Sequence, residues 1–359
     1  MSTIMVSIPK DILHMEILPW LSYKTLSKLS SVSKEWYHLI YHDSVFMHQH
    51  SYRHGSLGFM CVRDHNVDFV PINMFGKLNI YEPETSFSSF PDGTGCARIV
   101  ASTNGLLLLL LKTRWENHNL FNNSTFHYIW NPVTKEGHAI PESHTRNNEY
   151  IGLAYEPLAS PTHYKLVKLI VDNLIKFKKF EFKIYLSDMR KWITYDQRLV
   201  IQVQCSMCWW NVLYIRGIIY WNCDPYIIWF DLDKNISDYM LPPIEQFKYF
   251  QYLGVTDEEI LTNTQQLYNN SFLIWMMAKE GEWVKRYHLD SINIMDDSYF
   301  LPLPFMGGNK FYIEMTIKGK NMLCYYQMAT KEIIEISELE NHRFLTPCQY
   351  TLLNYNSNR

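Results

Sequence analysis

The first 54 residues carry apolar side chains at helical spacing. Residues 12–18 are mostly apolar and follow Ser7–Asp11, where a proline and an aspartate favour the first turn of a helix. In residues 25–40, a period of about 3.6 residues places an apolar arc opposite a polar one. A third apolar piece follows at 45–47. The pattern predicts three helices, with residues 25–40 forming one continuous helix, and a core too small to be very stable alone.

From residue 55 onward the pattern changes to short apolar runs separated by polar turns, which predicts β-strands. Three copies of one unit recur, each an apolar run followed by a polar turn with lysine: 128–135, 227–234 and 323–331. Glycine-containing turns before apolar runs predict hairpins. These turns are Asn104-Gly105, Arg216-Gly217 and, for the third copy, Lys318-Gly319.

The spacing of these units predicts the architecture. A variant of the unit lies between the copies, and five marker positions are separated by 55, 45, 45 and 51 residues, with a mean of 49. Kelch-type propeller blades repeat at about 50 residues, so the remaining ~300 residues allow about six blades. The markers are Asn131, Leu186, Asp231, Met276 and Gln327.

Composition supports a mainly β fold with a small N-terminal α part. Aromatic residues make up 15% of the chain, and rings fill the space between packed blades. We expect residues 57–72 to supply the first strands, and residues 349–353 to form a late strand that helps to close the ring. A β-sandwich of similar strand content is the alternative.

The N-terminal residues resemble an F-box in order and spacing. The resemblance covers about one eighth of the chain and is carried by the Val-Ser-Lys-x-Trp core at its distance from Ile-Pro, with Ser22 where many members have proline. The matching segments are 8–12, 17–21, 24–26, 32–36, 39–40 and Phe46.

This resemblance implies docking on a Skp1-type adaptor, which joins an F-box protein to cullin and RING subunits. Some of the matching residues must face the internal core, and the sequence does not sort them. The positions that would make or support the adaptor contact are Pro9, Ile12, Leu18, Leu26, Leu29, Val32 and Trp36.

A second resemblance covers residues 100–245 most strongly. Asn-Gly-Leu-Leu, then Ile-Trp-Asn-Pro-x-Thr-Lys, then Ile-Pro is similar to the kelch-like F-box-associated domain of plant F-box proteins. Such a domain is expected to recognise substrates. We therefore divide the chain into an F-box over 1–54 and a kelch-like β-propeller over 55–359.

Charge and hydropathy exclude some partner classes. The net charge of −3 gives no general attraction to nucleic acid or to anionic lipid. The longest aliphatic run, Leu106–Leu111, is too short to cross a bilayer, which needs about 20 residues. Residues 1–7 lack the features of a signal peptide. We expect a protein of the cytoplasm, the nucleus or both, with reduced cysteines.

The sequence shows no catalytic, metal or cofactor motif. Cys205 and Cys208 form a lone CxxC pair, with Cys223 and His288 as distant further ligands, and buried strand is the favoured interpretation. The histidines before residue 55, such as His48 and His50, are expected to face the surface or a partner. Asp231 and Asp233 are too few for calcium and are expected to cap a turn.

The function predicted from both resemblances is that of a non-catalytic substrate-recognition subunit of an SCF-type (Skp1-cullin-F-box) E3 ubiquitin ligase. The chain would bridge the adaptor to an unknown target protein, with no cofactor. The long insertion around Trp115, Asn117 and His118 is a candidate target-binding loop. The alternative is a propeller interaction scaffold that acts outside a ubiquitin ligase.

Overall fold

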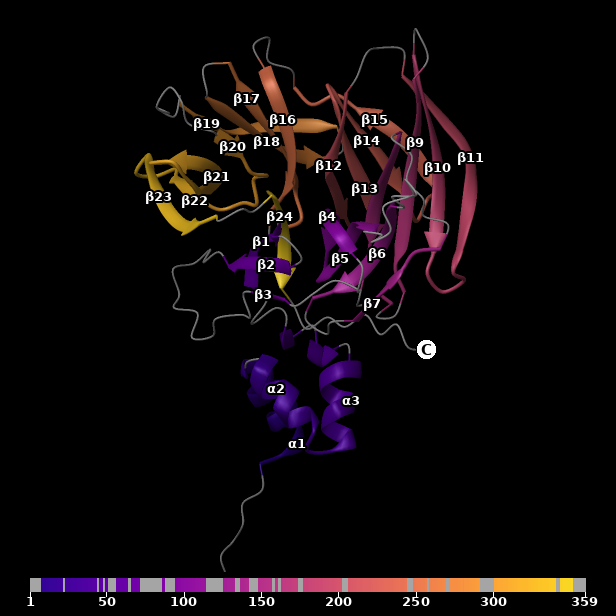
Figure 1. The fold of residues 1–359 in the computed structure, drawn as a ribbon, viewed down its shortest axis with the longest axis vertical. Helices are drawn as coiled ribbons and strands as arrows, with labels where there is room; N and C mark the ends of the chain where they lie inside the picture. Colours follow the sequence, from indigo (N-terminus) through magenta and orange to yellow (C-terminus); the bar gives the residue numbers. More distant parts are fainter. Residues whose placement is uncertain are drawn as a thin grey trace, which may run out of the picture.

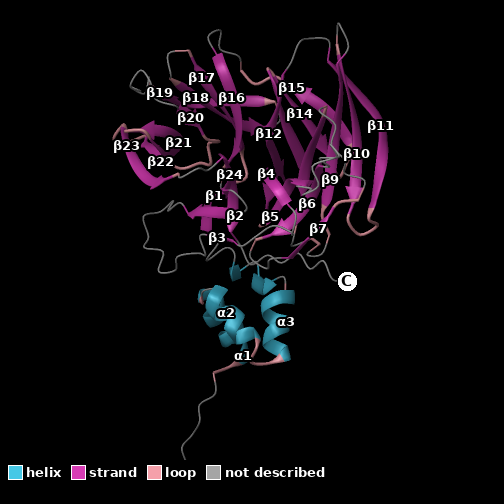
Figure 2. Cartoon of the chain, viewed as in Figure 1, coloured by secondary structure: helices cyan, strands magenta, loops and turns pink. Residues whose placement is uncertain are grey.

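The computed structural model divides into a group of helices at one end and a ring of β-sheets at the other (Figures 1 and 2). It describes residues 8–21, 23–43, 45–47, 49–50, 56–63, 66–71, 86–87, 94–113, 125–132, 136–141, 148–156, 159–160, 163–173, 177–201, 206–243, 248–256, 258–268, 271–279, 281–290, 300–339 and 343–350.

The helices divide differently from the prediction. The first runs as α1 (Lys10–Ile12) and a π-helical turn (Leu13–Ile17), and a 3₁₀ turn (Leu18–Trp20) follows. The continuous helix predicted over 25–40 is wrong, because α2 (Tyr23–Ser30) and α3 (Lys34–His42) are separate. Ser33 causes the break: its extended backbone and its Oγ, which accepts from the Trp36 N–H at 3.1 Å, begin a new helix.

The described strands form six four-stranded antiparallel sheets, named A to F. Sheet A contains β24 (Arg343–Tyr350), β1 (Ser56–Arg63), β2 (Asn66–Pro71) and β3 (Ser86–Phe87). Sheet B contains β4 (Thr94–Thr103), β5 (Leu106–Thr113), β6 (Thr125–Asn131) and β7 (Glu136–Ala139). Sheet C contains β8 (Glu149–Ala154), β9 (Lys165–Asn173), β10 (Lys178–Leu186) and β11 (Lys191–Ile201).

The second half of the ring repeats this order. Sheet D contains β12 (Ser206–Ile215), β13 (Ile218–Asp224), β14 (Tyr226–Asp231) and β15 (Ile236–Met240). Sheet E contains β16 (Lys248–Val255), β17 (Leu261–Leu267), β18 (Phe272–Lys279) and β19 (Glu282–Leu289). Sheet F contains β20 (Phe300–Pro302), β21 (Lys310–Ile317), β22 (Lys320–Gln327) and β23 (Glu332–Glu338).

Six hydrophobic clusters join these sheets in a closed circle. Each cluster takes its buried side chains from two successive sheets: A with B, B with C, C with D, D with E, E with F, and F with A. The leucine run on β5 shows how one strand serves two clusters. Leu106 and Leu108 pack against sheet C, whereas Leu107 and Leu109 pack against sheet A, because alternate side chains point to opposite faces.

The circle excludes the β-sandwich alternative, in which two sheets share one interior. A radial propeller gives every sheet two buried faces, and this explains why apolar runs in the middle strands are continuous instead of alternating. The inner strand β12 also lies against β4 as well as β8 and β16, so the inner strands pack closely around the axis.

The ring is closed by hydrogen bonds between distant parts of the chain. β24 pairs antiparallel with β1, from Ser56 opposite Tyr350 to Val62 opposite Arg343. The predicted closing strand is therefore present, although it begins earlier than expected, and residues 351–353 lie outside the described part. β1 and β2 are the first strands predicted over 57–72.

The marker positions and the three glycine turns agree with the prediction. All five markers lie on the third strand of their sheets. Asn104-Gly105 and Arg216-Gly217 have positive φ at both residues and join first to second strands, as in a two-residue hairpin. Lys318-Gly319 has the same backbone form and also makes a hairpin, but it joins the second and third strands of sheet F.

Two glycines allow a test of how tightly sheets E and F pack. A Cβ on Gly254, at the end of β16, would clash with the Phe305 carbonyl oxygen and lie 2.9 Å from the Phe305 backbone nitrogen. Gly281 has a positive φ of 77° but meets no atom within 4 Å. We predict that Gly254→Ala lowers the free energy of unfolding by at least ~2 kcal/mol. Gly281→Ala should cost only about 1 kcal/mol, from its backbone strain.

Chemical denaturation of the two variants measures this difference. Equal costs would show that the backbone around Phe305 moves aside without loss of packing.

Candidate functional site

The helical module, defined as the described residues from 8 to 50, has a small core of its own. Its core side chains come from the π-helical turn, the 3₁₀ turn, α2, α3 and residues 45–47, so these segments hold one another in place, whereas α1 contributes none. The His50 Nε2 lies 3.0 Å from the Leu21 carbonyl oxygen and ties the end of the module to its middle. The fully buried members are Leu18, Leu26, Ile40 and Phe46.

The structure sorts the seven residues predicted to contact or support the adaptor. Leu18 and Leu26, 1% and 0% exposed, belong to the internal core and have no surface to offer a partner. Leu29 and Trp36 are half-buried and pack against that core. The exposed members are Pro9, Ile12 and Val32. No contact with an adaptor is tested by this arrangement, so the docking role stays a prediction.

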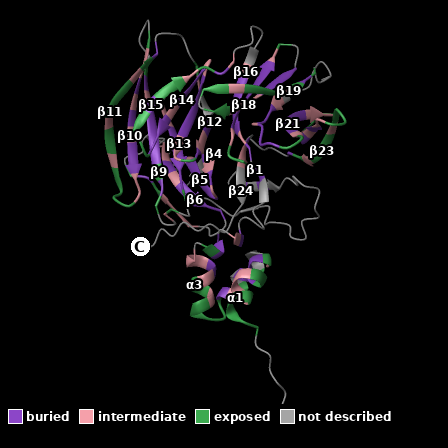
Figure 3. Cartoon of the chain, turned by 180° about the vertical axis from the view of Figure 1, so that it is seen from behind, coloured by how far each residue is buried: buried purple, intermediate pink, exposed green. Residues whose placement is uncertain are grey.

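Further exposed apolar side chains on the module were missed by the sequence reasoning. Ile8, Ile17, Trp20, Tyr37 and Val45 are large, and more than a third of each side chain is open to solvent. Figure 3 shows exposed residues along α1 and α3.

An ion pair joins the start of α1 to the start of α3. Lys10 Nζ lies 2.7 Å from Glu35 Oε1, and this hydrogen bond and the charge of Lys10 lower the pKa of the Glu35 carboxyl. Both side chains are well exposed, so the pair contributes little to stability. The pair brings the first turns of α1 and α3 together beside Pro9.

The predicted target-binding residues Trp115, Asn117 and His118 lie outside the described residues. They belong to the connection between β5 and β6, the second and third strands of sheet B. Their role stays a prediction.

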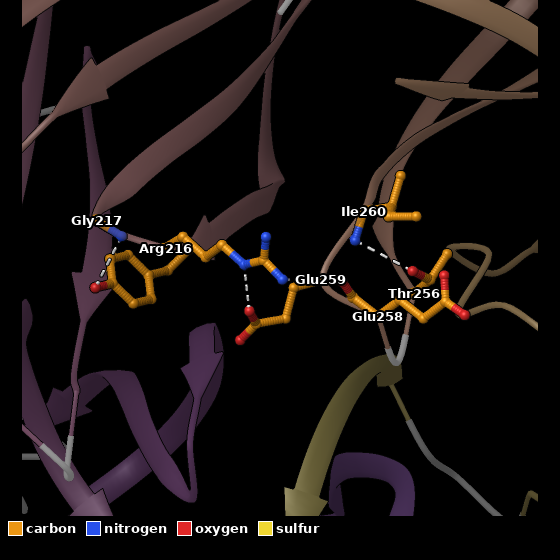
Figure 4. Close-up of polar contacts among 7 residues, drawn as sticks. Arg216, Gly217, Thr256, Glu258, Glu259 and Ile260 are labelled. Carbon is orange, nitrogen blue, oxygen red and sulfur yellow. Dashed lines mark hydrogen bonds and ion pairs between the residues drawn. The ribbon is translucent and has the colours of Figure 1, made fainter. Parts of the chain in front are cut away.

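The connections between first and second strands link successive sheets at one rim of the ring (Figure 4). Arg216, in the sheet D turn, donates from Nε to Glu259 Oε2 at 2.6 Å and from Nη2 to the Glu258 carbonyl at 3.3 Å in sheet E. Asn104 of sheet B donates to the Tyr155 carbonyl of sheet C at 2.7 Å. These links bind one turn to the next.

Tyr214 continues this rim from sheet C to sheet D. Burial, together with the charge and hydrogen bond of Glu156, raises the pKa of the Tyr214 hydroxyl, which keeps it protonated in neutral solution. The same oxygen accepts the Gly217 N–H at 3.1 Å. The Tyr214 hydroxyl thus both donates and accepts, and it supports the turn.

Buried amides replace apolar side chains along part of the boundary between sheets D and E. Asn222 donates from Nδ2 to Asn211 Oδ1 at 3.2 Å and to the Gln251 backbone carbonyl at 2.9 Å. Gln251 donates from Nε2 to Asn222 Oδ1 at 2.8 Å. Asn263 and Gln265 extend the network along β17 to the Pro243 carbonyl. Such a network fixes one register between the sheets, because each member needs its partners.

Asp231 caps the turn between β14 and β15, as predicted. Its Oδ1 accepts from the backbone N–H groups of Asp233 at 3.0 Å and Lys234 at 2.9 Å, and its Oδ2 lies 3.0 Å from Lys234 Nζ. Burial alone would raise the pKa of this carboxyl, but the hydrogen bonds from Lys234 outweigh it, and the pKa is lowered.

The structure also bears on the metal-ligand, cysteine and histidine candidates that lie among the described residues. In that part of the chain no three His, Cys, Asp or Glu side chains are placed to share a metal ion. Cys223 is a buried free thiol in the cluster between sheets C and D, and Cys205 lies outside the described part. The expectation that the early histidines face the surface or a partner is wrong for His50, which is buried. No helix in the described ranges is long and apolar enough to cross a membrane.

A ring of antiparallel sheets behind a small helical module defines a β-propeller protein with an N-terminal helical part. The family model for the F-box associated beta propeller domain matches residues 59–349. The chain belongs to this family.

Two relatives come from Arabidopsis thaliana. A putative F-box protein is 25% identical over 243 residues, which cover 61% of this chain and 55% of the relative. A second F-box protein is 24% identical over 222 residues, covering 60% of this chain and 53% of the relative. The match thus spans about half the length of these curated relatives. The chain is similar to plant F-box proteins with a propeller domain.

Solved structures resemble the chain only distantly. A lectin of Aleuria aurantia matches with 9% identity and a TM-score of 0.41, covering 80% of this chain and 96% of the lectin. The propeller domain of the trilobed protease from Pyrococcus furiosus matches with 12% identity and a TM-score of 0.37, covering 69% and 72%. Neither similarity says anything about activity.

The amide network predicts a large cost for losing its central member. Asn222→Ala removes the buried hydrogen bonds that Asn222 makes with Gln251 Nε2 and with the Gln251 backbone carbonyl, so the free energy of unfolding should fall by about 3 kcal/mol. Asn321→Ala, at an exposed position on β22, is the matched control and should change it by less than about 0.5 kcal/mol. Denaturant unfolding measures both, and equal small effects would contradict the role of the network.

The Asp231 turn predicts a pH dependence. The lowered pKa means that the ionised carboxylate stabilises the folded chain above the unfolded value near 3.8, and that this stabilisation is lost as the pH falls through the folded pKa. Near neutral pH, wild type should therefore have a higher free energy of unfolding than Asp231→Asn, by about 1 kcal/mol or less, and should melt at a higher temperature. The gap should close in acid. Thermal melts across pH check this, and a gap that widens in acid would be the contrary result.

Proposed function

We propose that this chain is the substrate-recognition subunit of an SCF-type (Skp1-cullin-F-box) E3 ubiquitin ligase. Its helical module would dock on a Skp1-type adaptor, and through it on cullin and RING subunits. Its propeller would hold a target protein for ubiquitination. Membership of the F-box-associated propeller family and the F-box names of the relatives support this proposal.

The observation that carries the proposal is the density of exposed apolar side chains on the helical module. Among the described residues, seven of the eighteen large hydrophobic side chains that are exposed lie on this module, which is about one eighth of the chain. A unit with so small a core loses stability by exposing them unless a partner covers them. The surface that we assign to the adaptor is formed by Ile8, Pro9, Ile12, Ile17, Trp20, Val32, Tyr37 and Val45.

The proposed mechanism needs no bond-making by this chain. The propeller acts as a rigid holder, since its sheets are joined by apolar clusters and by the polar links of the rim. Holding the target near a ubiquitin-conjugating enzyme that carries ubiquitin raises the local concentration of the target's lysines. This higher local concentration accelerates ubiquitin transfer. Trp115, Asn117 and His118 are proposed to contact the target.

The proposal places the protein in the cytoplasm, the nucleus or both, where such ligases would meet their targets. The other candidate, a propeller scaffold outside a ubiquitin ligase, shares the same fold. Binding to the adaptor separates the two.

Val32→Asp tests adaptor docking without disturbing the core. Val32 is 68% exposed, so a carboxylate there stays hydrated in the free protein and becomes costly only when a partner covers it. We expect binding to a purified Skp1-type adaptor to weaken by about 30-fold, which is roughly 2 kcal/mol. Calorimetry or surface plasmon resonance with the full chain measures this. Leu26→Asp is unsuitable, because Leu26 is buried and the change would unfold the module.

Val284→Asp is the matched control. Val284 is 54% exposed on β19 of the propeller, and the same substitution there should leave adaptor affinity unchanged. If wild type does not bind the adaptor, or if the Val32 and Val284 variants bind equally well, the ligase proposal is wrong and the scaffold alternative gains.

A further inference from the structure

The outer edge of sheet D is closed by side chains instead of by another strand. β15 is the outermost strand of this sheet and pairs on its inner side with β14, with Phe230 opposite Ser237 and Ile228 opposite Tyr239. An outermost strand normally presents a row of unpaired N–H and C=O groups, which invites another chain to add a strand. On β15 the Ser237 N–H, the Ser237 carbonyl and the Tyr239 N–H are already engaged by side chains.

Gln197, from sheet C, occupies the place of a facing strand residue. Its Oε1 accepts the Ser237 N–H at 3.0 Å, and its Nε2 donates to the Ser237 carbonyl at 3.3 Å. A residue of an added strand would form the same two hydrogen bonds with Ser237. The primary amide of glutamine is suited to this, because it carries a donor and an acceptor side by side.

Asp238 closes the next outward position. In an antiparallel ladder, backbone groups of alternate residues point the same way, so Tyr239 points outward as Ser237 does. The Tyr239 N–H donates to Asp238 Oδ1 at 2.8 Å. Both outward N–H groups within this five-residue strand are therefore bonded to side chains.

A bulge in sheet C aims Gln197 at this edge. The pairing of β10 with β11 runs from Phe182 opposite Tyr195 to Glu181 opposite Arg198, which leaves Asp196 and Gln197 without opposite residues. Such bulges redirect side chains out of a regular ladder. The link therefore comes from a local irregularity 40 residues before Ser237.

We propose that Gln197 and Asp238 are a closure device that keeps β15 from pairing with β15 of a second copy of this chain. A second copy fits this edge because two identical strands can pair antiparallel about a two-fold axis. The outward N–H and C=O groups of one β15 then face those of the other β15. Ile236 and Tyr239, 41% and 40% exposed, would gain cover in that pairing. The Asp238 carboxylates would approach each other across the axis, so their like charge opposes the pairing.

The double variant Gln197→Ala with Asp238→Ala tests this proposal in the full chain. It frees the Ser237 and Tyr239 groups and removes the repelling charge. We expect the mass from light scattering to double relative to wild type as protein concentration rises. Hydrogen exchange of residues 236–240 should be faster than in wild type in dilute solution, and slower again when the protein is concentrated.

Two further variants separate strand pairing from general destabilisation. Asp188→Ala removes the same type of contact, Asp188 Oδ1 to the Met189 N–H at 2.9 Å, in a turn outside any strand, and should behave as wild type. Gln197→Glu with Asp238→Ala disturbs Ser237 but keeps a charge at the edge, and should not double in mass. The proposal is overturned if the Gln197→Ala double variant keeps the wild-type mass at every concentration, or if the Gln197→Glu double variant associates as strongly.

Discussion

The whole structure depends on burying both faces of every sheet. A four-stranded sheet of mostly apolar side chains cannot stand alone in water, and here each sheet is covered by its neighbours through six clusters that return to their start. This requirement makes the pairing of β24 with β1 decisive, because one open boundary would expose an apolar face on each side. The polar links at the rim and the amide network act within this ring and set its register.

The helical module obeys the opposite rule. It is too small to bury all its apolar residues, so some lie in its core and others on its surface. Leu26 is buried, whereas Val32, six residues later, is open to solvent. The ring covers its apolar faces by itself, whereas the module leaves large apolar side chains exposed. This contrast supports the proposed bridge more directly than any single motif does.

The repeat of the propeller could be predicted because it is local and periodic. Markers such as Asn131 and Asp231 are the last residues of the third strand in their sheets, so their spacing does not depend on how the side chains pack. The helix over 25–40 was mispredicted because hydrophobic periodicity continues through the break, while the signal that ends it is the side-chain cap at Ser33. The hairpin at Lys318-Gly319 was predicted, but not that it joins the second and third strands of its sheet, because a turn motif fixes backbone shape and not the strands that it joins.

The contacts of the candidate site were harder to foresee than its location. Resemblance named the residues expected to contact an adaptor but could not separate Leu18 from Ile12, since both are apolar and only packing decides which one is buried. Ser237, the partner of Gln197, and Gln251, one partner of Asn222, lie 40 and 29 residues away in sequence, on other sheets, and no pattern in one sequence records such pairs.

The closure of the ring also sets an order of events during synthesis. β1 follows the helical module directly, but its partner β24 is made almost 300 residues later. At bacterial to eukaryotic ribosome speeds of about 5–20 residues per second, this delay is roughly 15–60 s. For most of that time the module has left the ribosome while the propeller still lacks its last strand. The adaptor proposed to bind the module would then meet an unfinished ring, before any target could be held.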